Sequence, residues 1–173
     1  FPARPLGRRK MVRIDGAPSV WQELPEPLAL EIGRAVASFG HLEDMLKRAI
    51  FALDQRRLPA SIHDRDFRSW LRRMDHVAAD SLGTLIERLE RTLAREGRAD
   101  PELIAQLDEV KSWRNLLCHA NWQPRGGAWQ PIFANTRGEI FDGTLDPLDI
   151  RAIRDMSLDS ARRVARIIEA LDD

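Results

Sequence analysis

The sequence predicts an all-α fold, an up-down bundle of four to five mostly antiparallel helices with a small β-hairpin or meander before the last helix. Apolar residues recur at steps of three and four before residue 120 and again after residue 146, which is the period of an amphipathic helix. Between residues 121 and 143 this period is lost and turn signals bracket short apolar runs, which indicates strands. A chain of 173 residues with 43% hydrophobic side chains is long enough to bury one core.

Residues 1–25 are rich in proline and basic residues and lack a sustained period. We therefore expect a basic, proline-rich N-terminal extension, followed by a single helical domain over residues 26–173. The first helix starts at Pro27, because proline suits the first turn of a helix. Gly33 and Gly40 either weaken this helix, by about 1 kcal/mol each relative to alanine, or allow a neighbouring helix to approach closely.

Two further helices are expected before the β insertion. An apolar stripe from Phe67 to Leu93 predicts one long helix. Asp100-Pro101 combines an N-cap residue with proline at the first helical position, and it predicts a third helix that runs towards His119.

The β insertion, at about residues 121–143, contains the turn signal Gly126-Gly127. Pro131 lacks the amide hydrogen that a central strand donates, so its segment is restricted to a sheet edge. Asp146-Pro147 then repeats the cap-plus-proline start and predicts the last helix, or two helices with a break near Ser157.

Composition excludes several function classes. The 27 basic and 27 acidic residues balance, so no overall field attracts nucleic acid or a membrane, although only three of the basic residues are lysines. Arginine is the better residue for bidentate contacts to phosphate. The only cysteine is Cys118, which precludes an intrachain disulfide and fits a reducing compartment; we expect it to be a small buried residue. No apolar run approaches the roughly 20 residues that span a bilayer. We expect a cytoplasmic, soluble protein without a membrane partner.

The motifs of several common enzyme sites are missing from the sequence. It has no phosphate-binding G-x-x-x-x-G-K-[ST] loop, no G-x-G-x-x-G, no G-x-S-x-G and no H-E-x-x-H. The four histidines share no metal-ligand spacing. We therefore expect no cofactor and no histidine metal site, while a site built from carboxylates alone stays open.

The candidate site is the polar cluster Arg114, Asn115 and His119, within the segment W-R-N-L-L-C-H-A-N-W. Arg114 follows the apolar residue Val110 by four positions, so it emerges beside the buried stripe rather than on the solvent face. Asn115 and His119 stack one turn apart on a helix, about 40° from each other. Arg114 and His119 are about 140° apart, a gap that two facing copies of the chain would close.

These residue types suit metal-independent cleavage of RNA. A histidine can take the proton of a ribose 2′-hydroxyl or give one to the leaving 5′-oxygen. A guanidinium can bind two phosphate oxygens and stabilise their growing charge, and the amide of Asn115 can orient either group. The alternative is a structural capping network, in which His119 binds terminal carbonyls and Arg114 pairs with an acid. Glu43 and Asp44 on the first helix are within reach as that partner or as a catalytic acid.

Arg114-Asn115-x-x-x-His119, near the end of the third long helix of a small helical domain, resembles the R-x(4–6)-H motif of the HEPN superfamily. The residue after the arginine is typically polar in that family, as Asn115 is. The resemblance covers roughly residues 26–172. It implies a homodimeric, metal-independent endoribonuclease, often a toxin or defence effector, whose two motifs face one cleft. Arg114 would bind phosphate, His119 would exchange protons, and Asn115 would support them.

The resemblance leaves alternatives open. Some HEPN proteins have lost activity, so the alternative function is a silent dimeric module that binds RNA or a protein. An antitoxin or defence partner is a further expectation. HEPN toxins that are silenced by nucleotidylation carry a tyrosine two residues after the histidine, whereas this chain has Asn121 there and no tyrosine at all.

Four further residues are candidate RNA contacts. Arg72, Arg73 and Arg125 offer charge to a phosphate backbone, and Trp122 offers a ring on which a base can stack. The alternative for the arginines is a solvated helix face. The alternative for Trp122 is packing against the bundle.

Overall fold

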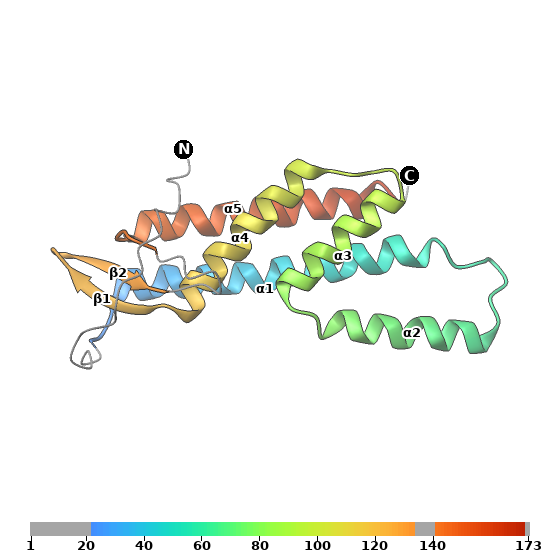
Figure 1. Cartoon of the computed structure of the whole chain (residues 1–173), viewed down its shortest axis with the longest axis horizontal. Helices are drawn as coiled ribbons and strands as arrows, with labels where there is room; N and C mark the ends of the chain where they lie inside the picture. Colours follow the sequence, from blue (N-terminus) through green and yellow to red (C-terminus); the bar gives the residue numbers. More distant parts are fainter. Residues whose placement is uncertain (1–21, 134–140, 172–173) are drawn as a thin grey trace.

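The structure is a computed structural model that describes residues 22–133 and 141–171 (Figure 1). Within these residues the elements are α1 (Glu26–Gln55), α2 (Asp64–Ala78), α3 (Leu82–Arg95), α4 (Pro101–His119), β1 (Asn121–Arg125), β2 (Ala128–Ile132) and α5 (Pro147–Glu169). This arrangement confirms the predicted all-α bundle with a β-hairpin before the last helix. Most of the predicted N-terminal extension, residues 1–21, and part of the predicted insertion, residues 134–140, lie outside the described residues.

The cap-plus-proline signals mark the starts of α4 and α5. The carboxylate of Asp100 accepts a hydrogen bond from the amide of Leu103 at 2.9 Å. Asp146 and Asp149 form a reciprocal capping box at the start of α5. Because both caps are followed by proline at the first helical position, the two helices begin at the residues that the sequence predicts.

The prediction of one long helix over residues 67–93 is wrong, because α2 ends at Ala78 and a new helix, α3, begins at Leu82. Ser81 adopts an extended conformation and caps α3 by accepting from the amide of Thr84. A 2.5 Å ion pair between Asp80 and Arg88 stabilises the same turn. The apolar period continues across the break, so periodicity alone does not reveal the turn. By contrast, α5 is one helix and has no break at Ser157.

The extra turn changes the direction of the last helix relative to the first. Consecutive helices alternate in direction, which makes α1, α3 and α5 parallel to one another (Figure 1). The predicted "mostly antiparallel" packing therefore fails at the most extensive helix contact, the parallel pair α1 and α5. Ion pairs join Glu31 of α1 to Arg151 of α5 near their N-termini, and Met45 and Ile168 line one groove further along.

Both α1 and α5 bury several small side chains. Those that are at most 5% exposed are Ala35, Ser38, Ala49, Ser157, Ser160 and Ala161. Short side chains let two helix backbones approach closely, because little volume separates them. Gly33 and Gly40 do not serve this purpose. Both are exposed, and nothing lies within 4 Å of where their Cβ atoms would be, so the close-approach interpretation of these glycines is wrong.

A buried carboxylate joins the N-terminal halves of α1 and α5. Glu31 is 3% exposed and accepts hydrogen bonds from Arg34 at 2.9 Å, Arg154 at 3.1 Å and Arg151 at 3.3 Å. Burial acts to raise the pKa of Glu31, but the hydrogen bonds and charges of Arg34 and Arg151 outweigh it. The pKa of Glu31 therefore lies below its ordinary value of 4.5.

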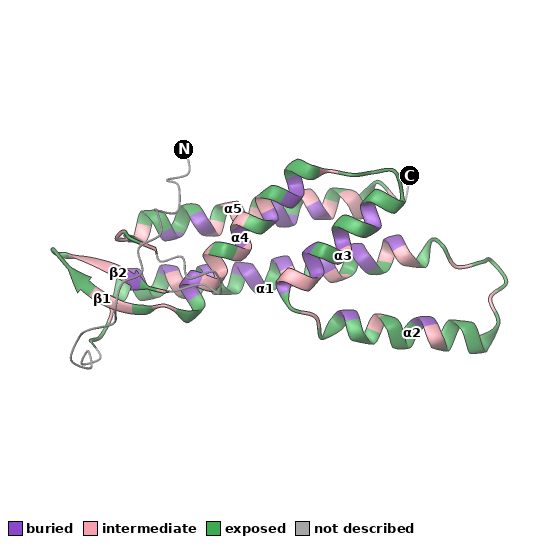
Figure 2. Cartoon of the chain, in the orientation of Figure 1, coloured by how far each residue is buried: buried purple, intermediate pink, exposed green. Residues whose placement is uncertain are grey.

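The helix α2 is the least integrated element. Only Trp70 and Val77 are buried in it, and most of its length is exposed (Figure 2). Trp70 anchors the helix to α1, because its indole nitrogen donates to Asp54 at 3.1 Å and its ring contacts Phe51 at a centroid distance of 4.8 Å. Arg95 of α3 donates to the same carboxylate at 3.1 Å. A single side chain, Asp54, thus joins three helices.

The hairpin is a two-stranded antiparallel sheet with Gly126-Gly127 at its turn. Both glycines have positive φ, 59° and 83°, which only glycine adopts readily. Pro131 pairs with Trp122, and because a two-stranded sheet consists of edges, its missing amide hydrogen is tolerated. Backbone pairing of Trp129 with Leu145 links the hairpin to the segment before α5.

The hydroxyl of Ser157 is fully buried and has no hydrogen-bond partner among the described residues. We expect Ser157→Ala to raise the free energy of unfolding by about 1 kcal/mol, because it removes an unpaired buried polar group. Ser160→Ala is the matched control, since Ser160 lies in the same contact but donates to the carbonyl of Met156 at 2.9 Å. Urea denaturation of both variants measures the difference. Equal changes in stability would contradict this account of Ser157.

The low pKa of Glu31 makes stability depend on pH. The contribution of its carboxylate is complete above the unfolded-state pKa and is lost as the pH falls through the lower folded-state value. We expect Glu31→Gln to be less stable than the wild type at pH 7, with a difference that shrinks below about pH 4.5. Thermal unfolding from pH 7 to pH 3 tests this. The control is Asp155→Asn, which removes an exposed carboxylate that also pairs with Arg154. If the stability difference between this variant and the wild type shrinks equally at low pH, Glu31 is not the group responsible for the pH dependence.

Candidate functional site

Arg114, Asn115 and His119 lie in the last two turns of α4, the helix that leads directly into the hairpin. Arg114 and Asn115 are half-buried, and His119 is exposed. Leu116 and Leu117 point into the core from the same turns. The polar cluster therefore lies at the edge of the buried stripe, where rigid helix backbone holds it but solvent reaches it.

Among the described residues, Arg114 makes two polar contacts. Its guanidinium donates to the amide oxygen of Asn115 at 3.2 Å and lies 3.7 Å from a carboxylate oxygen of Glu43 on α1. The second distance is too long for a hydrogen bond, so the pair is an ion pair held by charge alone. Because both side chains are partly solvated, the pair contributes about 0–1 kcal/mol. An anion that offers true hydrogen bonds could displace Glu43.

His119 is the last residue of α4, where a cationic side chain is favoured by the helix dipole. Its ring stacks on Phe133, with a centroid distance of 6.5 Å and an interplanar angle of 25°. No hydrogen bond within the described part of the chain engages its ring nitrogens. The alternative in which His119 caps the helix by binding terminal carbonyls therefore does not hold for this side chain. The other part of that alternative, the pairing of Arg114 with an acidic residue, does occur.

Within one chain, the side chains of Arg114, Asn115 and His119 do not converge on one point. Five residues of helix separate Arg114 from His119 by about 7.5 Å along the axis and by about 140° around it. Asn115 lies one turn before His119 and holds its amide oxygen towards Arg114, which leaves its amide hydrogens directed elsewhere. One copy of this site presents a cation, an amide and an imidazole along a surface, without enclosing a substrate between them.

Cys118 is exposed, which contradicts the expectation of a buried residue. The core positions at this end of α4 are taken by Leu116 and Leu117, and the next residue points outwards because successive helical positions differ by about 100°.

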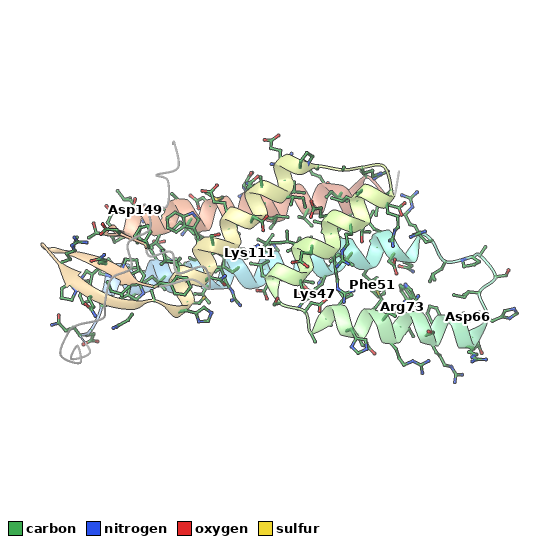
Figure 3. All side chains as sticks on the ribbon, in the orientation of Figure 1. Lys47, Phe51, Asp66, Arg73, Lys111 and Asp149 are labelled. Carbon is green, nitrogen blue, oxygen red and sulfur yellow. The ribbon has the colours of Figure 1, made fainter. Side chains whose placement is uncertain are left out.

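The four further candidate residues do not gather at the cluster. Arg72 and Arg73 are exposed on α2, and Figure 3, where Arg73 is labelled, shows this helix far from the hairpin. Trp122 is half-buried and packs against the core, which agrees with packing against the bundle, the alternative to base stacking. Arg125 is near the turn of the hairpin and donates to Gln130 at 3.0 Å and Asp142 at 2.9 Å.

The sequence did not single out two residues, Phe133 beside the cluster and Glu31 between α1 and α5. Phe133, which follows the hairpin, contacts His119, and hydrophobic periodicity does not predict the path of the chain between them. Glu31 is detectable in hindsight, because it follows Leu28 by three positions and precedes Ala35 by four, inside an otherwise apolar stripe. A charged residue in such a stripe signals a buried ion pair.

Among the described residues, no group of three or more histidine, cysteine or acidic side chains is arranged to hold a metal ion. None of the described helices has the length and hydrophobicity needed to span a membrane. No protein-family model, curated protein or solved structure matches the chain. Arguments about function therefore start from the site itself.

Releasing Arg114 from Glu43 should strengthen anion binding at this site. We expect Glu43→Gln to raise the affinity for pyrophosphate about two- to fivefold, because the competing charge is lost while the side-chain shape is kept. Titration followed by amide chemical shifts of Arg114 and Asn115 measures the change. The matched control is Asp44→Asn, which removes the same charge from a residue that pairs with Arg48 instead. A similar gain in both variants would show a general charge effect.

Proposed function

We propose that the chain is a HEPN-like endoribonuclease that cleaves RNA without a metal ion, with Arg114 and His119 as its central residues. The observation that carries this proposal is the state of the two side chains. Arg114 is held only by a long ion pair and one amide contact, and the ring nitrogens of His119 have no partner among the described residues. Both groups are therefore free to meet a phosphate and its leaving group.

In the proposed reaction the 2′-oxygen of a ribose attacks the adjacent phosphorus. The O2′–P bond forms, the P–O5′ bond breaks, and the products end in a 2′,3′-cyclic phosphate and a 5′-hydroxyl. An imidazole of His119 accepts the 2′ proton or supplies a proton to the departing 5′-oxygen, which contributes about 10²- to 10⁴-fold to the rate. Arg114 donates two hydrogen bonds to the non-bridging oxygens as their charge grows, and Asn115 holds Arg114 in place.

The proposal includes a homodimer with the two clusters facing one cleft. Within one chain the residues of the cluster point in different directions, and one imidazole cannot both accept the first proton and donate the second in the same step. Two facing copies supply two imidazoles and bring an arginine of one protomer near the histidine of the other. A toxin or defence effector, with a protein that restrains it, is the biological setting that this activity fits.

A silent module that binds RNA or protein is the second candidate. The observation in its favour is that Arg114 is already paired with Glu43 and Asn115, so the cluster can serve as a binding surface without chemistry. Trp122 and Arg125 are engaged by the core and by the hairpin itself, which leaves few groups to hold RNA tightly.

Cleavage of end-labelled RNA in EDTA separates the two candidates. We expect the wild type to release fragments with cyclic-phosphate ends, and His119→Ala to lose at least about 100-fold in rate. His76→Ala is the matched control, since His76 is exposed on α2, away from the cluster. Arg114→Lys keeps the charge but loses the bidentate geometry and should lose about 100-fold.

Each outcome assigns the site. Cleavage that His119→Ala leaves unchanged would refute this catalytic role. Absence of cleavage by the wild type across varied RNAs, combined with RNA binding that Arg114→Ala weakens, would favour the silent module.

A further inference from the structure

A groove separates α2 from the α1–α5 pair, away from the cluster on α4. Its volume is about 690 Å³, which is within the range of small-molecule sites. The apolar side chains that line it include Met45, Phe51, Leu71, Met74, Val77 and Ile168. Phe51 and Leu71 remain 37% and 39% exposed there, so the groove is open to solvent.

The groove exists because α2 is anchored at one point. Trp70 fixes the helix to α1 through Phe51 and Asp54, and beyond this anchor the helix does not close against α5. Methionine side chains at Met45 and Met74 are flexible and polarizable, so the walls can adapt to an apolar guest.

One cation in the groove lacks a partner. Lys47 lines it, is half-buried, and has no ion pair or hydrogen bond among the described residues. It lies one turn before Phe51 on the same face of α1 (Figure 3). The adjacent Arg48 is neutralised by Asp44 at 2.7 Å. The acidic groups at the groove, Asp75 and Glu169, are both exposed and so keep their hydration.

We propose that this groove binds a small apolar monocarboxylate, whose hydrocarbon body lies on the methionine-rich floor and whose carboxylate pairs with Lys47. A partly desolvated ammonium gains from an anion, since the apolar walls reduce the screening of that pair. A partner helix or a second copy of the chain fits less well. A stable protein interface buries about 1,200–2,000 Å², whereas the exposed large apolar side chains beside the groove are limited to Phe51, Phe67 and Leu71 among the described residues.

Methyl NMR of the whole chain labelled at methionine tests the proposal. Octanoate and 3-phenylpropanoate represent aliphatic and aromatic acids, and octan-1-ol and octylammonium carry the aliphatic body with other head groups. We expect the carboxylates to shift the signals of Met45 and Met74 but not that of Met156, which does not line the groove. The comparison of the two acids shows which apolar body the groove prefers.

Two variants make the test specific. We expect the wild type to bind octanoate about fivefold more tightly than octan-1-ol. Lys47→Met keeps the apolar stem of the side chain but removes its charge, so it should abolish this difference in affinity. Lys111→Met is the matched control, because Lys111 pairs with Asp108 on α4 and does not line the groove. Ala165→Phe should fill the groove and remove binding of every probe.

Three results would overturn the proposal. One is the absence of shifts at Met45 and Met74 at millimolar carboxylate. Another is tighter binding of octylammonium than of octanoate, which would assign the site to Asp75 and Glu169. The third is a concentration-dependent shift of these methyl signals without any probe, which together with a dimer in sedimentation would identify a second copy of the chain as the occupant.

Discussion

The structure depends on the long helix α1, which is the shared partner of α2, α3, α4 and α5. Its most extensive contact is with α5, and there small side chains such as Ala35 and Ser160 let the two helices approach closely. A close parallel pair brings the N-termini of both helices, and their partial positive charges, to the same end of the molecule. Glu31 is buried near that end, and its negative charge offsets part of the charge of the surrounding arginines. The carboxylate thus joins α1 to α5 near the N-termini of both helices.

The same helix supplies the surroundings of both sites. On one side Glu43 reaches Arg114 of α4, and one turn further along Lys47 faces the groove beside α2. Since helical positions four apart share a face, a single stretch of α1 borders the polar cluster and the groove. A change that tilts α1 would alter both, although different helices complete them. Glu43 and Lys47 are themselves suitably spaced to interact, but no ion pair joins these two described residues. Glu43 lies near Arg114 of α4, whereas Lys47 lines the groove.

The sequence predicts well what local chemistry determines. Asp100-Pro101, Asp146-Pro147 and Gly126-Gly127 each specify a cap or turn without help from the rest of the chain, and the structure follows them. It predicts less well what depends on distant packing. The period across Ser81 is the same whether the helix continues or restarts, so it reveals neither the break after Ala78 nor the parallel α1–α5 pair. The position of Arg114 beside the core, with Glu43 as an available partner, was predictable from helical spacing, whereas the contact of His119 with Phe133 required the path of the hairpin. The assignment to RNA cleavage stays a prediction.

Charge pairing explains how a neutral, arginine-rich chain could still select a phosphate. Many of its arginines are committed to structural carboxylates, as Arg154 is to Glu31, Arg163 to Asp100 and Arg88 to Asp80. These pairs hold helices together and contribute little field at a distance, because each positive charge is compensated nearby. The carboxylate partner of Arg114 is too far away for a hydrogen bond, as are those of Arg57 and Arg162, but only Arg114 lies in the polar cluster with Asn115 and His119. Under the proposed function, a phosphate that accepts two short hydrogen bonds from this guanidinium would gain more than the loss of Glu43 costs. Selectivity would then follow from the weakness of this ion pair rather than from the total charge of the molecule.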